Sequence, residues 1–526
     1  MSAGDPGDAA AWRPSHNPWL IALVVTGAAF MEVLDTTIVN VALPHIAGSL
    51  SSSQDESTWT LTSYLVANGI VLPISGWLSN VFGRKRFFVS CILAFTACSV
   101  LCGLATNLSE LVIFRVLQGL FGGGLQPSQQ AILLDTFPPE QRGRAFSVVA
   151  VATVIAPVLG PSLGGWITDS YSWRWIFFVN LPVGLLAALL VMHVVQDPPT
   201  ARADPAKARH IDYPGLGLIA LGLGCLQVTL DRGEIDDWLA SGFIRVFALL
   251  SFLGIAGAIL WLSIARNPVV DLRLFRNRNF AVGCLLMFVF ASVLYGGAVL
   301  MPQMAQQQFG YTSLLAGFLL SPAALVTAML LPLVGRLMSR VPPRYLILFG
   351  FLVVGLGYFL SAGLTPEVNF AWLVRARIAV TIGIGFLFAP ISVATTATLS
   401  SEQNNAGAAL FVMARNVGGS VGIAVVTAIV ALRSQVHMAY LSAHLSTLQQ
   451  GFTSALATRV ETLIGLGRSA AEAQTQAQGM FYRELLHQSA VMGYIDAFLY
   501  SGIAALLVMP LCLLIRGGVA RSRGAS

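Results

Sequence analysis

The sequence predicts an all-α protein that crosses a membrane many times. Of its 526 residues, 56% are hydrophobic and only 10% are charged, whereas soluble domains carry about 25% charged residues. The mean hydropathy of +0.75 agrees with this class. Apolar stretches of about 20 residues, long enough to cross a hydrocarbon core, recur about fourteen times. The expected spans are 19–41, 57–79, 86–106, 109–134, 144–169, 174–195, 213–231, 240–265, 279–303, 313–337, 343–363, 370–397, 406–432 and 489–515.

The basic residues predict that both termini are cytoplasmic. The net charge of +6 comes almost entirely from arginine, since Lys85 and Lys207 are the only lysines. Basic residues follow the second, fourth, sixth, eighth, tenth and last spans, and the positive-inside rule places such connections in the cytoplasm. The connection 400–405 lacks a basic residue and departs from this pattern. We therefore interpret the charge as membrane topology and not as nucleic-acid binding.

The chain divides into two groups of six expected spans separated by an insert. A tail (1–18) precedes the first six-helix bundle (19–195), and 196–278 contains a Pro-rich charged linker and two inserted helices. The second six-helix bundle covers 279–515, includes an extracytoplasmic loop at 433–488, and is followed by a tail (516–526). Gly76-x-Leu78 and Gly335-x-Leu337 are each followed by a basic turn, a faint repeat typical of secondary transporters. The amphipathic pattern within 433–488 has two interpretations, a capping helical hairpin or a docking surface for a periplasmic partner.

Two acids occupy the first expected span. Glu32 and Asp35 are three residues apart and share a helix face, which Thr36 and Asn40 extend. A charge at the bilayer centre costs about 2.5–3.5 kcal/mol on insertion scales, so such acids mark functional sites by default. This polar stripe predicts a protein interior or a water-filled path beside the helix.

The fourth span presents a matching basic stripe. Arg115, Gln118, Gly122 and Gln126 fall on one helix face. An arginine within the membrane needs a cavity or a carboxylate, and Glu32 or Asp35 are the expected partners. Such a pair is either part of the transport chemistry or a purely structural ion pair.

Glycines and prolines mark two further segments. The turn after the second span contains Gly76, Asn80, Gly83 and Arg84, in which Gly83 permits a tight turn. In the fifth span, small residues permit close approach of another helix and prolines bend the backbone, at Pro157, Gly160, Pro161, Gly164 and Gly165. A purely structural helix contact is the alternative interpretation.

Three polar residues near the end of the chain complete the candidate set. Arg415 and Asn416 lie in the thirteenth span, where lining a cavity is favoured over facing lipid. Asp496 lies early in the last span and is either a second coupling acid or an interfacial residue. The six cysteines lie in expected spans without the CxxC or His spacing of a metal site, so we interpret them as packing residues and predict no metal.

Taken together, these segments resemble a known transporter family. The Gly76–Arg86 turn is similar to motif A of the major facilitator superfamily, although that family usually has Asp where this chain has Asn80. The run from Arg115 to Gln126 resembles motif B, and that from Ala156 to Gly165 resembles motif C, the antiporter motif. With the run from Leu34 to Pro44 and that from Trp173 to Pro182, the ordered set resembles the fourteen-helix drug:proton antiporters of the EmrB/QacA type.

The resemblance implies a function. It implies the major facilitator fold with two inserted helices, and proton-driven multidrug efflux of hydrophobic or amphipathic molecules by alternating access in the bacterial inner membrane. Its closest likeness, to EmrB-like subunits, implies a periplasmic adaptor and an outer-membrane channel as partners.

From these patterns we assign roles to the candidate residues. The expected proton-coupling residues are Asp35, ranked first, then Glu32, Arg115 and Asp496. The expected cavity residues are Asn40, Gln118, Gln126, Arg415 and Asn416. We expect no enzymatic activity and no cofactor, and the absence of a GxxxxGK[ST] pattern excludes a P-loop ATP site.

Two alternatives remain open. One is a dedicated proton-coupled exporter of a metabolite such as a fatty acid, a siderophore or an amino acid. The other is a non-transporting membrane receptor or scaffold, against which the acidic and basic stripes argue. The likeness to motif C disfavours an importer.

Overall fold

The computed structural model describes residues 14–198, 212–266, 268–363, 369–400, 403–443 and 450–515. Within these residues, thirteen helices are long and apolar enough to cross a membrane. A further long helix, α7 (Pro139–Ser170), covers the expected span 144–169, although some of its side chains lie outside the described residues. The prediction of an all-α polytopic membrane protein is confirmed. The linker 199–211 and the tails 1–13 and 516–526 lie outside the described residues.

The first group of helices packs around α1, which contacts α7, α9 and α6. Its elements are α1 (Pro18–Ser49), α2 (Gln54–Ser57), α3 (Trp59–Phe82), α4 (Arg84–Leu104), α5 (Leu108–Gly122), α6 (Leu125–Thr136), α7, α8 (Trp175–Phe178) and α9 (Asn180–Val194). Helix α3 packs against α5, and α4 packs against α5 and α9. We call this group the N-terminal half.

The second group packs around α12 and α17, which lie against each other. Its elements are η5 (Leu272–Arg276), α12 (Arg278–Phe309), α13 (Ser313–Leu337), α14 (Pro343–Ala362), α15 (Phe370–Gly385), α16 (Phe388–Thr396), α17 (Asn404–Ser442), α18 (Gln450–Gly465), α19 (Ala470–Leu507) and α20 (Met509–Cys512). We call it the C-terminal half. It meets the N-terminal half where α13 and α16 contact α7 and where α17 contacts α3 and α6.

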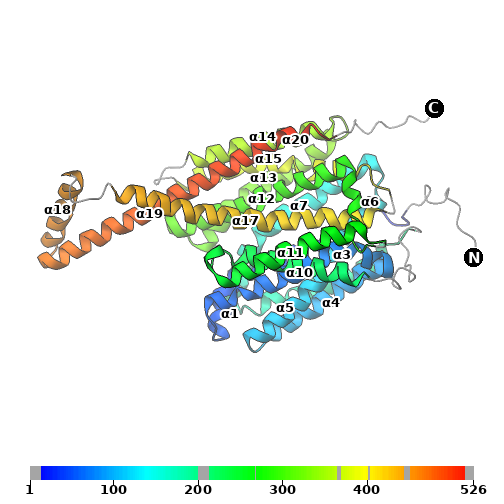
Figure 1. Cartoon of the computed structure of the whole chain (residues 1–526), viewed down its shortest axis with the longest axis horizontal. Coiled ribbons are helices and arrows are strands. Elements are labelled where there is room, and N and C mark those ends of the chain that lie inside the picture. The colour runs from blue at the N-terminus through cyan, green and yellow to red at the C-terminus, as the bar shows by residue number, and fades with distance from the viewer. Residues whose placement is uncertain are drawn as a thin grey trace, which may run out of the picture.

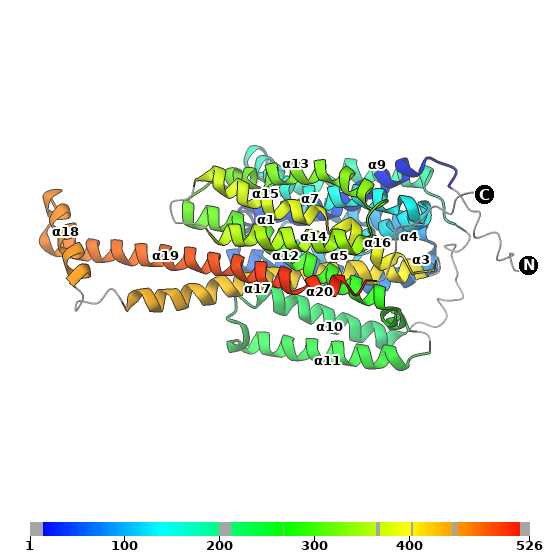
Figure 2. The same cartoon turned by 90° about the horizontal axis from the view of Figure 1, so that it is seen from above.

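The two inserted helices form a hairpin along one side of the bundle. Helices α10 (Tyr213–Arg232) and α11 (Gly242–Ile264) pack against each other and are joined through the short helix η4 (Trp238–Ala240). Figure 2 shows the pair beside the rest of the bundle. Only α10 of the pair makes extensive contact with both α3 and α17, so it lies at the seam between the halves.

The expected outer loop is largely helical. Helix α17 continues ten residues past the expected span end, to Ser442, and α19 begins at Ala470, before the expected start at 489. Both extend beyond the bundle, and α18 packs against the outer part of α19, as Figure 1 shows. The segment therefore projects away from the bundle and does not fold over its end as a cap. We call this the projecting end, and the opposite end, with Arg84, Arg144 and Arg336, the basic end.

Two expected spans are broken helices. The span 109–134 is divided into α5 and α6 at Gly123 and Gly124, and the span 370–397 is divided into α15 and α16 at Phe386 and Leu387. At the first break, a Cβ on Gly124 would lie 2.7 Å from the Cys91 sulfur. The apolar pattern continues through each break, so hydropathy alone predicted one helix where the structure has two.

Candidate transport site

Helix α1 places both acids inside the N-terminal half. The helix is continuous from Pro18 to Ser49, although it contains Pro44. Glu32 is 3% exposed and Asp35 is 1% exposed. Trp19 packs against Phe137 next to the α6–α7 turn, so α1 begins at the basic end and runs toward the projecting end.

Asp35 is held by an ion pair and two amides. Arg115 Nη1 donates to Asp35 Oδ2 at 2.6 Å, and both side chains are fully buried. Gln118 Nε2 and Asn180 Nδ2 donate to Asp35 Oδ1 at 3.0 and 2.7 Å. Arg115 Nε donates to the Thr60 carbonyl at 3.0 Å. Helices α1, α3, α5 and α9 therefore meet at one compensated pair of charges.

Glu32 is held by neutral donors. The Tyr64 hydroxyl and Asn68 Nδ2 each donate to Glu32 Oε1 at 3.1 Å. The Gln126 side-chain amide donates to Glu32 Oε2. Arg415 of the C-terminal half acts on Glu32 through space, and no hydrogen bond or ion pair joins the two side chains in the described structure. The charge on Glu32 is thus less compensated than the charge on Asp35.

The break between α5 and α6 explains why the two glutamines serve different acids. The sequence predicts Arg115, Gln118 and Gln126 on one face of a continuous helix, but this is wrong beyond Gly122 because the helix breaks. Gln118 stays with Arg115 and accepts its hydrogen bond at 2.8 Å, whereas Gln126 reaches Glu32. Of the two expected partners, Arg115 pairs with Asp35.

In the C-terminal half, Arg415 lies on the side that faces Glu32. It is 2% exposed, and its guanidinium donates to Asn416 Oδ1 at 3.3 and 3.4 Å. Arg415 and Glu32 both act electrostatically on Tyr295 of α12, so these three side chains share one region between the halves. Close packing of α17 on α12 holds Arg415 there, since a Cβ on Gly418 would lie 2.8 Å from the Phe288 Cα.

The polar stripe on α1 becomes more exposed toward the projecting end. Glu32 is buried, Thr36 is half-buried and Asn40 is exposed. These residues follow one another at single-turn spacing along one face. The stripe therefore opens away from the basic end, and Asn40 lies at its open part, separate from the two acid clusters.

The basic end is closed by contacts between the halves. Asn405 Nδ2 of α17 donates to Asn80 Oδ1 of α3 at 2.5 Å. Asn404 Nδ2 donates to Asp135 Oδ1 at 2.8 Å, and Asp135 is also paired with Arg84. Gly83, with φ of 84°, makes the turn that brings Arg84 to this position. The halves are thus joined by the side-chain amides of Asn404 and Asn405, and the Arg84–Asp135 ion pair within the N-terminal half supports this cluster.

Close helix contact explains three glycines, Gly76 near this closure and Gly160 and Gly164 in α7. A Cβ on Gly76 would lie 2.9 Å from the Asn405 carbonyl oxygen, and one on Gly164 would lie 3.0 Å from the Ile38 carbonyl oxygen. A Cβ on Gly160 would overlap Thr37, whose hydroxyl donates to the Ala156 carbonyl at 3.4 Å. Gly165 faces a looser contact with Val41 at 3.9 Å. The side chains of Pro157 and Pro161 lie outside the described residues.

Comparison with known proteins identifies the family. The Major Facilitator Superfamily model matches residues 25–423. The chain belongs to the major facilitator superfamily. It is therefore a multi-pass membrane transporter and not an enzyme, as the sequence predicts.

Relatives within the superfamily are similar over almost the whole chain. "Multidrug export protein EmrB" of Escherichia coli (strain K12) is 33% identical over 493 residues, which cover 94% of each chain. The Haemophilus influenzae protein of the same name is 37% identical over 428 residues, 81% of this chain and 83% of that one. "Fatty acid resistance protein FarB" of Neisseria gonorrhoeae is 33% identical over 489 residues, 93% of this chain and 94% of that one. The predicted resemblance to the EmrB type is confirmed.

Solved structures support the superfamily fold. The proton:xylose symporter XylE matches with a TM-score of 0.57 at 14% identity, covering 91% of this chain and 94% of that one. The human organic anion transporter MFSD10 matches with a TM-score of 0.58 at 13% identity, covering 93% of this chain and 100% of that one. At this identity the likeness describes the fold alone.

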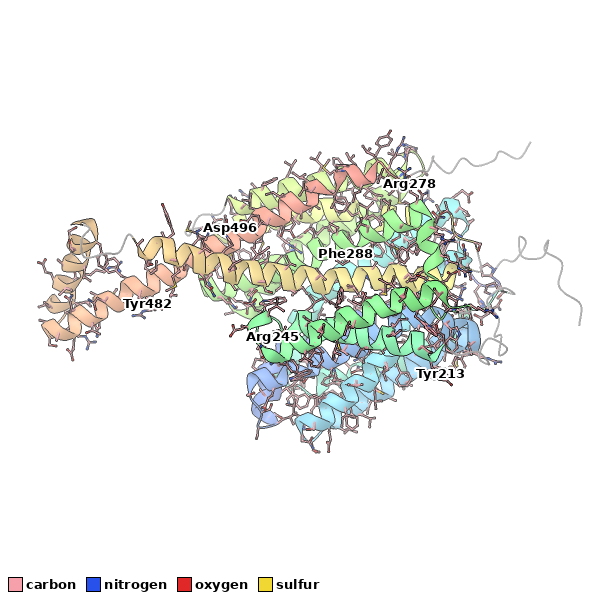
Figure 3. The ribbon with its side chains drawn as sticks, in the orientation of Figure 1. Tyr213, Arg245, Arg278, Phe288, Tyr482 and Asp496 are labelled. Carbon is pink, nitrogen blue, oxygen red and sulfur yellow. The ribbon has the colours of Figure 1, made fainter. Side chains whose placement is uncertain are left out.

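Asp496 lies apart from the other candidate residues of this superfamily member. It accepts from Arg433 Nε at 2.5 Å and contacts His437 Nε2 at 2.7 Å. Figure 3 shows Asp496 on α19 near the point where that helix leaves the bundle. The structure does not bring Asp496 together with Glu32, Asp35 and Arg115.

Several residues of the site are missing from the sequence prediction. Tyr64 and Asn68 occur one turn apart in an apolar span, a spacing that could have identified them. Asn180, Asp135 and Asn404 carry no comparable signal, because their partners lie in helices distant along the chain.

Proposed function

We propose that this superfamily member is a proton-driven multidrug efflux antiporter of the bacterial inner membrane, exporting hydrophobic or amphipathic molecules by alternating access. The EmrB relatives support export of drugs. The observation that carries the proton step is the contrast between the two buried acids. Asp35 is paired with Arg115, whereas the donors to Glu32 among the described residues are the neutral side chains of Tyr64, Asn68 and Gln126.

Glu32 is the acid that exchanges the proton in this proposal. A proton on Glu32 removes a buried charge that only neutral donors satisfy. A proton on Asp35 instead breaks an ion pair and leaves Arg115 buried without its partner, which is far more costly. The ranking from sequence, which put Asp35 first, is therefore reversed in favour of Glu32. Asp35 and Arg115 join α1, α3, α5 and α9 into one unit that moves with the bound proton.

Protonation and cargo act on the same contact between the halves. Ionised Glu32 is attracted by Arg415, and a proton removes this attraction. A cargo molecule that binds between the halves meets Glu32, Arg415 and Asn416, so proton and cargo compete for one region. The membrane potential contributes about 2.3 kcal/mol per charge per 100 mV to each return step.

Alternating access uses the amide cluster at the basic end as one of two gates. The described conformation joins the halves through Asn80 with Asn405 and Asp135 with Asn404. The α1 stripe opens toward the projecting end. With the termini cytoplasmic, as the basic residues indicate, this is the outward-facing state, and cargo loading requires separation of the amide cluster.

The tripartite assembly is the second part of the proposal. The extensions of α17 and α19, with α18, support a periplasmic adaptor and, through it, an outer-membrane channel as partners. Arg459 covers the Phe481 ring at 4.5 Å and Phe452 packs on Phe481 at 5.4 Å, so the tip has its own small core. A preformed tip of this kind suits a helical partner, while the membrane lipids surround the bundle below it.

A dedicated fatty-acid exporter is the second candidate. The FarB relative, at 33% identity, favours it. Arg415 also supplies a positive charge suited to a carboxylate cargo.

One transport experiment tests the proposal and separates the candidates. Purified protein in proteoliposomes with an imposed pH gradient should accumulate cationic, neutral and acidic amphiphiles. Dissipating the gradient should stop accumulation. Movement of fatty acids alone would favour the second candidate, and no gradient-dependent movement of any compound would reject both.

A further inference from the structure

A third membrane acid, Asp231, lies outside the transport site. It is in the last turn of α10 and accepts a side-chain hydrogen bond from Thr62 of α3. Thr62 is two residues from Thr60, whose carbonyl accepts from Arg115. Residues two apart point to opposite sides of a helix. Asp231 therefore lies beside the first turn of α3, in a cluster separate from Arg115 and Asp35.

Two neutral side chains donate hydrogen bonds to Asp231. Gln227 Nε2 donates to Asp231 Oδ1 at 3.3 Å, and the other described donor is the Thr62 hydroxyl. The neighbouring Arg232 forms an ion pair with Asp236 at 3.1 Å and donates to Thr58 at 2.9 Å, and its charge also acts on Asp231. Asp231 is half-buried, one residue before the end of α10.

This acid lies at the seam between the two halves. Helix α10 packs closely on α3, because a Cβ on Gly224 would lie 3.3 Å from Ile70 and 3.5 Å from Val66. Gln227 Oε1 accepts from Ser420 Oγ of α17 at 3.1 Å. We call Thr62, Asp231, Gln227 and Ser420 the α10 seam; Tyr213 and Arg245, labelled in Figure 3, mark the start of α10 and the first turn of α11.

The α10 seam leads toward the transport site. Ser420 is one turn from Asn416, which accepts from Arg415. Polar groups therefore follow each other from Asp231 through Gln227 and Ser420 toward Arg415. Val66 and Ile70 give the α3 side of this path an apolar surface. A few polar groups beside apolar side chains are typical of sites for amphipathic ligands.

We propose that the α10 seam binds the positively charged end of amphipathic cargo, with Asp231 as the residue that selects for charge. This inference rests on the proposed export function and adds a recognition site separate from Glu32 and Asp35. The carboxylate supplies the negative charge, Gln227 and Thr62 hold it in place, and the apolar wall accepts the hydrocarbon part. Neutral cargo gains no binding affinity from the charge of Asp231.

A pair of size-matched probes tests this proposal. Binding of tetraphenylphosphonium, a lipophilic cation, and of triphenylphosphine oxide, a neutral compound, is measured on the full chain in lipid vesicles. Asp231→Asn should weaken cation binding about tenfold, and leave neutral binding within about twofold. Asp231→Glu should restore most of the cation affinity. Asp237→Asn, an exposed acid shortly after the end of α10, is the matched control and should change neither probe.

Equal loss of both probes, or unchanged cation binding in Asp231→Asn, would overturn the assignment. If Asp231→Asn fails to accumulate, Gln227→Leu keeps the acid but removes its amide donor and the Ser420 contact; it should also weaken the cation selectively, and equal loss of both probes would again overturn the assignment. A wild-type protein that binds the cation through Asp231 but moves no compound would reject the export function and leave this binding site standing.

Discussion

The guanidinium carbon of Arg115 lies 4.2 Å from the centre of the Tyr64 ring. The Tyr64 hydroxyl also donates to Glu32, so one side chain contacts both Glu32 and Arg115, the partner of Asp35. A cation over a buried tyrosine ring contributes about 2 kcal/mol when desolvated. In the proposed mechanism, displacement of Tyr64 when Glu32 changes charge is transmitted to the Asp35–Arg115 pair and links the proton to the helices that this pair joins.

The Asp35–Arg115 pair predicts a double-mutant result. Asp35→Asn or Arg115→Gln alone should lower stability by about 3–5 kcal/mol, because each leaves a buried charge unpaired. The double variant should recover much of that loss, as measured by thermal unfolding in detergent. Proton-driven efflux should be lost in all three. Recovery of efflux together with stability would mean that the pair is only structural.

The contact at Gly76 predicts a gating defect. Gly76→Ala should hold the basic end apart, because the new Cβ would lie 2.9 Å from the Asn405 carbonyl oxygen. Labelling of Asn405→Cys by a membrane-impermeant reagent from the basic side should rise in this variant, and efflux should fall. Gly69→Ala on the same helix α3 is the control, since nothing lies within 4 Å of its Cβ. Equal behaviour of the two variants would contradict the proposed gate.

Close packing of α7 on α1 makes a similar paired prediction. Gly164→Ala should lower the unfolding temperature and the efflux rate, since its Cβ would meet the Ile38 carbonyl oxygen at 3.0 Å. Overpacking of this kind costs about 1–3 kcal/mol. Gly165→Ala, whose nearest contact is Val41 at 3.9 Å, should behave like the wild type. A stronger defect at Gly165 would show that the helix faces are assigned wrongly.

The position of Asp496 predicts that it stabilises the start of the projection and does not take part in proton coupling. Because it pairs with Arg433 and His437 near the start of the projection, Asp496→Asn should retain drug-driven proton movement in vesicles. Stability should fall by about 1 kcal/mol, typical of a partly exposed ion pair. Complete loss of proton movement at normal expression would instead support the coupling role that the sequence analysis assigns to Asp496.

The sequence predicts the membrane fold well because apolar length and basic turns are local signals. It also identifies Glu32, Asp35 and Arg115, since charged residues within apolar spans are rare. It does not predict that Gln118 and Gln126 bind different acids, because that depends on the helix break at Gly123 and Gly124, through which the apolar pattern continues. Nor does it predict Asn80 with Asn405, whose contact requires the packing of helices 325 residues apart in the chain.

In the proposed mechanism, Glu32 exchanges the proton. The direct measurement is proton release from proteoliposomes when a drug is added, compared between the wild type and Glu32→Gln. Glutamine keeps a carbonyl oxygen for Tyr64 and Asn68, so the protein should fold and still exchange labelled drug across the membrane without a gradient. We predict that drug addition releases protons from the wild type and none from Glu32→Gln. Drug-driven proton release of wild-type size from Glu32→Gln would contradict this role of Glu32.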